Sequence, residues 1–399
     1  MDKILHADTY LSDRDLKFVV RALEAGELII FPTETVYGLG AIANNDEALK
    51  KIYKAKGRPV DNPLILHVAN KECFYRYSAQ KDEILDMILD EFTPGPLTLI
   101  VKAKPDVSSV VTAGLDTVAI RIPSNTIAHQ ILKMCSYALA APSANSSGKP
   151  SATVYKYAYD DLEPFIAYCV DGNDSEIGLE STILDMSVDS PIILRPGKIS
   201  AEEINNFLSS KGINLKVKYN DEIMVAQGLS GEDLCTTTYN LETNDSFTCD
   251  NIDDRSVSIT VPKAPGMKYR HYAPEATVYK LDSHNYSNDE NVDNNFSDLE
   301  QVISNIIDSE RLLSGDNVSI LASSRLANFI SNKFNQFNWS IYKCDGEYNA
   351  EFLAKNLYYA FRKLDEYKPK FILVEAISED GIGKAVMNRL NKACHAKRK

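Results

Sequence analysis

Hydrophobic and polar positions in the first half of the chain alternate between two periods. Residues 13–26 place apolar side chains at helical spacing and end at a glycine, whereas residues 28–31 form a short apolar run that suits a buried strand. The alternation continues through predicted helices (46–56 and 81–92) and predicted strands (64–68, 97–103, 118–123 and 137–142). Helices alternating with strands are typical of α/β layers.

The alternation pauses after residue 210 and resumes near residue 276. Ser200 and Glu203 form a capping-box signature for one more helix before the pause. Residues 221–260 then hold nine acidic residues and one basic residue, and residues 283–298 are rich in Asn, Asp and Ser. Both compositions favour solvated loops over a packed core.

The second half shows the same alternation on a smaller scale. Strands are predicted at 277–281, 318–322 and 371–376, and helices at 298–311, 349–364 and 383–396. We therefore predict two α/β domains, at residues 1–210 and 276–399, joined by a linker at residues 211–275. That linker contains APGMKYRHYAP (264–274), a basic and aromatic segment in acidic surroundings.

Composition narrows the class of protein. The 399 residues include 43 Lys and Arg against 56 Asp and Glu, and this net charge of −13 argues against broad nucleic-acid binding. No apolar run approaches the length of a membrane helix, and the N-terminal residues lack the apolar region of a signal peptide. The seven cysteines form no CxxC pair, which favours free thiols in a reducing compartment. We expect a cytoplasmic protein outside the membrane.

The segment FPTETVYGLGA (31–41) directly follows a predicted strand. Its proline, threonines, tyrosine and glycines favour a rigid loop that presents hydroxyl and amide groups to a ligand. A purely structural turn is the alternative.

The segment KGRPVDNPLILH (56–67) brings two cations together at the end of a helix. Lys56 and Arg58 are suited to a polyphosphate, because arginine offers a planar fork and lysine a point charge. Solvated cations that offset the helix dipole are the alternative. Asn62 and His67 follow, and His67 within an apolar strand is equally consistent with a satisfied core histidine.

The segment APSANSSGKPSAT (141–153) follows a strand, where ligand crevices form in α/β proteins. It lacks the Walker pattern, and a flexible serine-rich linker is the alternative. Arg121 and Arg195 lie within apolar strands, so each requires a carboxylate or a bound anion nearby. The alternative for both is a structural salt bridge.

No nucleophile–base pair stands out in the sequence: GxSxG, HExxH and paired Cys and His are absent. A site built from cations, hydroxyls and amides is suited to chemistry that depends on positioning and charge stabilisation. Phosphoryl and nucleotidyl transfer are reactions of this kind.

Taken in order, these segments resemble the threonylcarbamoyl-AMP synthase family, the YrdC-type enzymes, in its long two-domain form. The resemblance rests on the Lys56/Arg58 and Ser143/Asn145 pairs and on seven sets of motifs: PTETVYGLG, KAKGRPVDNPLILHV, PGPLTLIV with VAIRIPSN, APSANSSGKPSAT, GLESTILD with ILRPGKIS, PGMKYRHYAP, and LVEA with GIGKAVMNRL. It implies a twisted mixed sheet with helices around a basic cavity, plus a smaller Rossmann-like α/β domain. It also implies that the linker crosses the cavity mouth, where PGMKYRHYAP would act as a lid.

The implied reaction converts L-threonine, bicarbonate and ATP into threonylcarbamoyl-AMP and pyrophosphate, the first step of N6-threonylcarbamoyladenosine modification of tRNA. The implied partners are these substrates and a separate tRNA threonylcarbamoyl transferase, with no stable nucleic-acid binding. Mg²⁺ would arrive with ATP, and no protein-held metal site is implied.

The resemblance also assigns roles to particular residues. Lys56 and Arg58 would be catalytic through their charge. The threonine-binding set is Thr35, His67, Arg121, Ala141 and Ser181. The ATP-binding set is Arg58, Asn62, Thr117, Ser143, Asn145, Ser151, Arg195, Tyr269 and Tyr272, with Arg270 and His271 near the phosphates.

Two other functions compete with this interpretation. A carbamoyltransferase that forms carbamoyl-AMP would share the fold, but it would carry extra cysteine pairs that are absent here. An RNA-binding module would use the basic cavity for double-stranded RNA, but the net charge and the lack of a Lys/Arg stripe argue against it.

Overall fold

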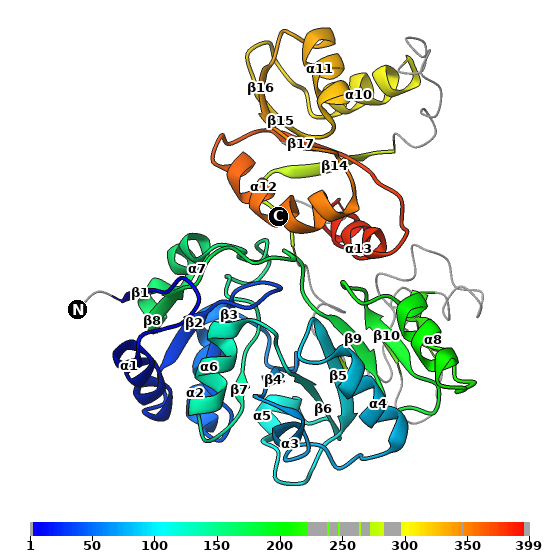
Figure 1. Cartoon of the computed structure of the whole chain (residues 1–399). Coiled ribbons are helices and arrows are strands. Elements are labelled where there is room, and N and C mark those ends of the chain that lie inside the picture. Colours follow the sequence, from blue (N-terminus) through cyan, green and yellow to red (C-terminus); the bar gives the residue numbers. More distant parts are fainter. Residues whose placement is uncertain are drawn as a thin grey trace, which may run out of the picture. The chain divides into compact units, whose positions relative to one another are not determined.

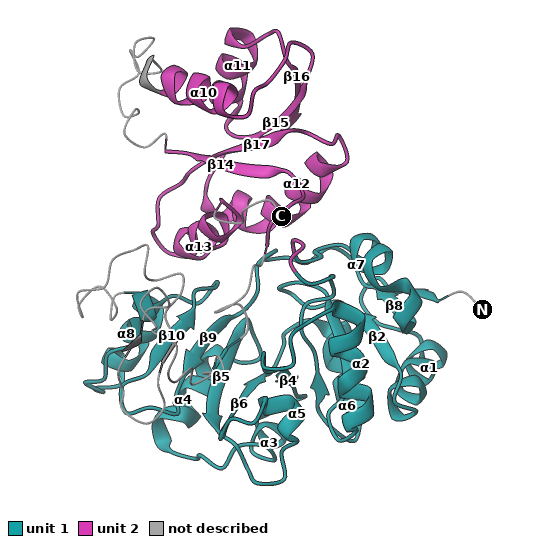
Figure 2. Ribbon diagram, turned by 180° about the vertical axis from the view of Figure 1, so that it is seen from behind, with its two compact units in different colours: residues 1–147, 151–269 teal, residues 148–150, 270–399 magenta. Residues whose placement is uncertain are grey.

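The computed structural model describes residues 3–221, 238–239, 246–247, 263–264, 272–282, 297–344 and 346–394. The chain packs as two compact units, both of the predicted α/β class. The first comprises residues 1–147 and 151–269, and the second comprises residues 148–150 and 270–399 (Figure 2). Residues of the predicted linker are therefore divided between the units, and a tripeptide from the first half of the chain belongs to the second unit.

The first unit is built on one mixed sheet with helices on both faces (Figure 1). Its strands are β1 (Ile4–His6), β2 (Leu28–Phe31), β3 (Gly38–Ile42), β4 (Ile65–His67), β5 (Leu97–Lys102), β6 (Thr117–Arg121), β7 (Leu139–Ala140), β8 (Ile166–Asp171), β9 (Thr182–Asp185), β10 (Ile192–Arg195) and β11 (Lys218–Tyr219). Its helices are α1 (Asp13–Glu24), α2 (Asp46–Lys56), α3 (Lys71–Phe74), α4 (Glu83–Phe92), α5 (Ser109–Thr112), α6 (Thr126–Met134), α7 (Tyr155–Leu162), the 3₁₀ turn η1 (Glu163–Phe165) and α8 (Ala201–Ser210).

The strand order in this sheet is β1-β8-β2-β3-β7-β4-β6-β5-β9-β10-β11. Parallel and antiparallel pairs are mixed: β4 runs parallel to β6, for example, and β6 runs antiparallel to β5. A separate pair of short strands, β12 (Thr238–Tyr239) and β13 (Ser246–Phe247), is antiparallel. The expected mixed sheet is thus confirmed.

Local signals explain where several helices begin and end. The Asn45 side chain caps the N-terminus of α2, and Gly57 ends that helix in the left-handed conformation. The predicted capping box of Ser200 and Glu203 is present at the start of α8. These helices begin and end where short polar or glycine signals occur in the sequence.

The strand β3 corrects one expectation, because residues 38–41 were expected to belong to a rigid loop. They instead pair antiparallel with β2. A Cβ atom on Gly38 or Gly40 would lie 3.1 or 2.9 Å from the ring of Phe31. Glycine is therefore needed to let the Phe31 ring pack across this strand.

The two faces of the large sheet are covered unequally. One face packs against α2, α4, α7 and α8 in the main hydrophobic core. Within the described residues, the other face packs against α1 and α6 over β2, β7 and β8. Over β4, β6, β5 and β9 the apolar cluster on that face is small, with the members Ile65, Ile100, Ala119, Ile183 and Ala264. The incomplete helix cover leaves room on this face for polar side chains.

The second unit has a parallel sheet of strand order β14-β17-β15-β16, with α10 and α11 on one face and α12 and α13 on the other (Figure 1). Its elements are β14 (Thr277–Leu281), α10 (Ser297–Ser309), β15 (Asn317–Leu321), α11 (Ser324–Lys333), β16 (Asn338–Tyr342), α12 (Ala350–Asp365), β17 (Phe371–Glu375) and α13 (Ile382–Cys394). This arrangement matches the expected smaller parallel α/β domain.

Two further observations concern the class of protein. Among the described residues, no helix combines the length and apolar character that a membrane crossing requires. The cysteines in the described ranges are free thiols, namely Cys73, Cys135, Cys169, Cys344 and Cys394.

Candidate active site

Three polar side chains lie side by side on the sparsely covered face of the large sheet. His67 of β4 is paired in register with Arg121 of β6, and Arg121 is paired with Thr98 of β5. Residues that are paired across neighbouring strands project to the same face. The sheet register therefore assembles a polar row from segments that are distant in the sequence.

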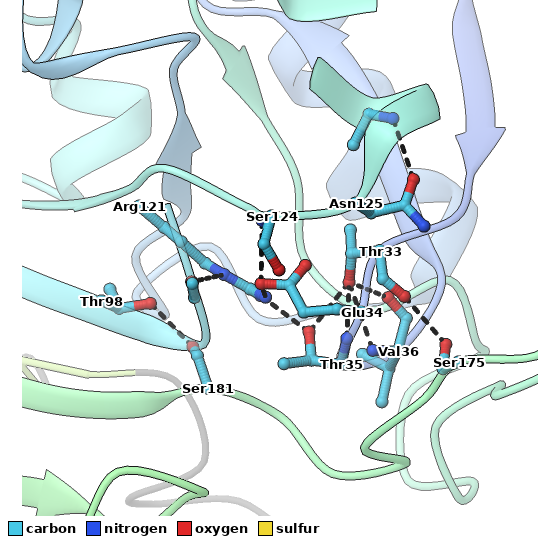
Figure 3. Close-up of polar contacts among 12 residues, drawn as sticks. Thr33, Glu34, Thr35, Val36, Thr98, Arg121, Ser124, Asn125, Ser175 and Ser181 are labelled. Carbon is cyan, nitrogen blue, oxygen red and sulfur yellow. Dashed lines mark hydrogen bonds and ion pairs between the residues drawn. The ribbon is translucent and has the colours of Figure 1, made fainter. Parts of the chain in front are cut away.

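Arg121 is the centre of this row and is 5% exposed. Its Nη1 donates to Thr35 Oγ1 at 2.7 Å, and its Nη2 lies 2.7 Å from Glu34 Oε1 (Figure 3). Its Nε donates to the Gly95 carbonyl at 3.3 Å. The buried guanidinium thus has the carboxylate partner that its position in an apolar strand required.

Glu34 was not singled out by the sequence analysis, although it lies beside Thr35 in the PTETVYGLG motif. Burial alone would raise the pKa of this carboxyl group, but the charge and hydrogen bonding of Arg121 outweigh burial and lower the pKa. Oε1 also accepts from the Ser124 amide, whereas Oε2 is buried and accepts no hydrogen bond from the described part of the chain. Glu34 therefore stays ionised and retains one oxygen for a donor on a ligand.

His67 is a neutral histidine in this structure. Burial, together with a smaller effect of the positive charge of Arg121, lowers its pKa to about 3. Its Nδ1 lies 3.3 Å from the Ile65 carbonyl, which can only accept, so Nδ1 carries the proton. The neutral ring then has Nε2 as a hydrogen-bond acceptor.

The low pKa of His67 predicts that the protein loses stability in mild acid. The pKa of a histidine in an unfolded chain is about 6.5, so between that value and about 3 the unfolded state binds one more proton. The free energy of unfolding should therefore fall by up to about 1.4 kcal/mol per pH unit as the pH drops below 6.5. The His67→Gln variant, which cannot titrate, should lose less stability between pH 7 and 5. Urea denaturation at several pH values checks this, and equal slopes for both proteins would contradict it.

Ser181 joins the polar row from the segment just before β9. Its hydroxyl shares a hydrogen bond of 2.7 Å with Thr98 Oγ1 (Figure 3). Arg195 donates to Ser181 twice, from Nε to the carbonyl at 3.0 Å and from Nη2 to the hydroxyl at 3.1 Å. Arg195 was predicted for the ATP set and Ser181 for the threonine set, so the structure connects the two predicted sets directly.

Lys56 and Arg58 are buried, being 4% and 8% exposed, which excludes the alternative of solvated surface cations. Lys56 Nζ donates to the carbonyl of Ser143 and to that of Asn145, the latter at 2.6 Å. Arg58 donates from Nε to the Asn62 carbonyl at 3.2 Å and from Nη2 to the Pro63 carbonyl at 2.9 Å. The two predicted hallmark pairs, Lys56/Arg58 and Ser143/Asn145, are thus in direct contact.

Asn62 and Ser151 are buried members of the predicted ATP set. Asn62 is 1% exposed, and its side-chain Oδ1 has no hydrogen-bond partner within the described ranges. The Ser151 hydroxyl donates to Glu180 Oε1 at 2.6 Å. A buried amide oxygen without a donor is unusual, and Asn62 can accept from an N–H group of a ligand.

The segment from Pro32 to Gly38 connects the polar row with the serine-rich loop. The Tyr37 carbonyl accepts from the Ala144 amide at 2.7 Å, and the Tyr37 amide donates to the Ala152 carbonyl at 2.9 Å. Gly38 forms an isolated bridge with Ser143. The serine-rich segment is therefore a fixed loop with buried residues, and the flexible-linker alternative is wrong for it.

The remaining predicted residues lie in three different places. Ala141 is held by its amide, which donates to the Ile65 carbonyl at 2.9 Å. Thr117 is buried on the same strand and face as Arg121, about 13 Å away along the strand. Tyr272 belongs to the second unit, where its ring stacks on Tyr358. Tyr269, Arg270 and His271 lie outside the described residues.

The geometry also bears on a metal ion. Within the described ranges, no group of three or more His, Cys, Asp and Glu side chains is placed to hold one.

The arrangement defines a class of protein: a two-unit α/β protein whose mixed sheet carries a buried polar site rich in cations. Lys56, Arg58, Arg121 and Arg195 are buried cations of the first unit, and Lys56 contacts the loop of residues 141–153, which is rich in hydroxyl groups. One end of the site, at Arg121, Glu34 and His67, offers a cation, an anion and a neutral acceptor, which is suited to a zwitterionic amino acid.

Comparisons with known proteins show which family of this class the chain resembles. Two family models match the chain, one described as "Telomere recombination" over residues 21–197 and one described as "Threonylcarbamoyl-AMP synthase, C-terminal domain" over residues 199–395. The threonylcarbamoyl-AMP synthase of Pyrococcus abyssi is 33% identical over 98% of both chains. That of Bacillus subtilis is 36% identical over 96% of this chain and 93% of its own.

A solved structure agrees with these matches. The crystal structure of P. abyssi Sua5 complexed with L-threonine has a TM-score of 0.75 to this chain, with 32% identity over 98% of this chain and 97% of its own. The chain therefore belongs to the threonylcarbamoyl-AMP synthase family.

Proposed function

We propose that this chain is an L-threonylcarbamoyladenylate synthase, a nucleotidyltransferase that makes threonylcarbamoyl-AMP and pyrophosphate from L-threonine, bicarbonate and ATP. The observation that carries the proposal is the buried contact of Arg121 with Glu34 and Thr35, in a unit whose buried Lys56 contacts the hydroxyl-rich loop. Near-full-length relatives that bear this enzyme name, and a related structure with bound L-threonine, support it.

The threonine end of the site follows from the polar row. The threonine carboxylate would pair with Arg121, whose planar fork matches two oxygens. The ammonium group would approach Glu34 Oε2, the oxygen that accepts no hydrogen bond from the described chain. Neutral His67 would accept from the substrate at Nε2, and Ser181 would supply a hydroxyl. The small apolar cluster around Ala119 lies beside Arg121 on the same face and would receive the methyl group.

Carbamate formation requires a neutral amine. Once the threonine ammonium group has released a proton to water, the lone pair of the amine attacks the carbon of bicarbonate or CO₂ and forms an N–C bond. With CO₂, a C–O π bond breaks and the nitrogen releases a second proton; with bicarbonate, the C–OH bond breaks and that proton leaves with the hydroxide as water. A lowered pKa makes Glu34 a weak base, so we assign it to holding the ammonium group and not to removing the proton. The carbamate is labile in water, and a buried site protects it from hydrolysis.

Adenylation follows at the ATP end. A carbamate oxygen attacks the α-phosphorus, the bond between the α-phosphorus and the bridging oxygen breaks, and pyrophosphate leaves. Lys56 and Arg58 would stabilise the negative charge that gathers on the phosphates in the transition state. The proposed ATP contacts are Asn62, Thr117, Ser143, Asn145, Ser151, Arg195, Tyr269 and Tyr272. Mg²⁺ would enter as part of the ATP complex, and no step is assigned to a protein-held metal.

The chemistry of the product implies a further partner. Threonylcarbamoyl-AMP is a mixed anhydride, so a transferase must consume it before water does. We propose a cytoplasmic location and transfer of the threonylcarbamoyl group to tRNA by a separate enzyme. No stable contact between this chain and the nucleic acid is needed for that transfer.

The test is direct detection of the product. The protein is incubated with ATP, Mg²⁺, bicarbonate and isotopically labelled threonine, and the AMP adduct is sought by mass spectrometry. We expect adduct and pyrophosphate only when all substrates are present. Pyrophosphate release without threonine would contradict the proposal. Tight binding of double-stranded RNA that falls steeply with salt would instead favour the RNA-binding alternative.

A further inference from the structure

The serine-rich loop contains a tripeptide that packs with the second unit. Residues 148–150 belong to that unit, although the residues on either side belong to the first (Figure 2). Arg362 of α12 donates to the Pro150 carbonyl from Nε at 3.0 Å and from Nη2 at 2.6 Å. Two hydrogen bonds from one guanidinium fix both the position and the direction of this carbonyl.

A second contact fixes the same tripeptide to the end of the linker motif. The Ala273 amide donates to the Gly148 carbonyl at 3.2 Å. The neighbouring Tyr272 is 5% exposed, its ring centroid lies 5.6 Å from that of Tyr358, and the Arg389 guanidinium lies 5.4 Å from its ring. Tyr272 has φ +71°, an uncommon conformation for an aromatic residue that only surrounding packing maintains.

The side chains that make these contacts follow one face of α12. Tyr358, Arg362 and Asp365 are spaced four and three residues apart, which places them on the same side of a helix. Asp365 accepts from the amides of Glu275 and Ala276 at 2.8 and 3.2 Å. A single helix face therefore holds both the tripeptide 148–150 and the segment 272–276.

The rest of the serine-rich loop is held from the first unit. Lys56 contacts the carbonyls of Ser143 and Asn145, and its own carbonyl accepts from the Ser147 amide at 2.8 Å. At the other end of the loop, Ser151 donates to Glu180. The middle of the loop, between these two anchored ends, is the part that α12 holds.

We propose that α12 positions the ATP-binding loop, with Arg362 as the positioning residue that sets the backbone between Asn145 and Ser151. The inference rests on the proposed function in placing ATP at this loop. Arg362 acts through the Pro150 carbonyl and has no contact with the reacting atoms in this assignment. Arg362 would thereby act on nucleotide binding through the tripeptide 148–150 of its own unit, whereas threonine recognition depends on the sheet residues around Arg121.

The test compares Arg362→Ala with two other variants. Arg362→Lys retains the charge but offers the carbonyl a point donor instead of a fork, so it should restore part of the function. Lys363→Ala is the matched control, because Lys363 is the adjacent residue and forms only an exposed pair with Glu366 among the contacts that the structure describes. Each purified full-length protein is assayed for ATP binding with Mg²⁺, for threonine binding, for the KM of both substrates, for kcat and for thermal unfolding.

We expect Arg362→Ala to raise the Kd and KM for ATP by about 5- to 20-fold, because two charge-assisted bonds that hold the loop are lost. The Kd for threonine should change less than about twofold, and Arg362→Lys should lie between Arg362→Ala and the wild type. Lys363→Ala should behave like the wild type. Unchanged ATP binding in Arg362→Ala would overturn the inference, as would an equal loss of ATP and threonine binding accompanied by a lower Tm.

The binding assays separate this inference from the proposed function. A wild-type protein that binds ATP but forms no threonylcarbamoyl-AMP would refute the proposed function, and the ATP affinities of the variants would still decide the role of Arg362. A wild-type protein that binds no ATP would overturn both.

Discussion

Replacement of Arg121 by alanine is expected to raise the threonine concentration needed for half-maximal rate by roughly 30- to 1,000-fold, with a much smaller change for ATP. The guanidinium is the proposed partner of the substrate carboxylate, and loss of a charge-assisted contact in a buried site costs about 2–4 kcal/mol. Steady-state kinetics with each substrate varied in turn measures the effect. Equal losses for threonine and ATP would show that Arg121 serves the fold and not threonine.

The structure supplies a control for this experiment. Arg121→Ala leaves the buried Glu34 carboxylate without its cation, which by itself destabilises the protein. The double variant Glu34→Ala/Arg121→Ala removes both charges, so it should regain stability without regaining threonine recognition. Thermal unfolding alongside the kinetics separates the two effects. A double variant with wild-type threonine KM would contradict the assignment.

Replacement of Lys56 by alanine is expected to lower kcat by about 10²- to 10³-fold, with a smaller effect on ATP affinity. The charge of Lys56 matters most when negative charge gathers on the phosphates in the transition state. Lys56 also holds the carbonyls of Ser143 and Asn145, so part of the loss will come from a displaced loop. Pyrophosphate release under saturating substrates is the measurement.

Lys54→Ala is the matched control for Lys56→Ala, because Lys54 is exposed on the last turn of the same helix. Arg58→Ala should change kcat in the same direction as Lys56→Ala. Near-normal pyrophosphate release in either of the two site variants would show that the substituted cation has a structural role only.

Much of the fold follows from local signals in the sequence. The predicted segments 28–31, 46–56 and 277–281 coincide with β2, α2 and β14. Each is bounded by a cap, a glycine or a clear change in hydrophobic period, and such signals act within a few residues. In contrast, α7 has no side-chain cap at its N-terminus and only two buried residues, so pattern analysis does not predict it.

The sequence predicted most of the residues that belong to the candidate site, but it did not predict which of them contact one another. The position of Arg121 in an apolar strand required an anion, yet only the structure shows that Glu34 supplies it. Pairing of His67 with Arg121 depends on strand register, which short strands do not encode locally. The sequence shows only that Tyr358, Arg362 and Asp365 have the spacing of one helix face. The structure shows that this face of α12 contacts the loop, through the hydrogen bonds from Arg362 to Pro150.

The separation between Pro150 and Arg362 has a consequence during synthesis of the protein. The two residues are 212 positions apart, so a ribosome working at about 5–20 residues per second needs roughly 10–40 s to reach Arg362 after Pro150 has been made. The first unit can begin to fold during this interval, while the middle of the serine-rich loop still lacks its donor. With Arg362 in its proposed role, each newly made molecule would acquire full affinity for ATP only after α12 has left the ribosome.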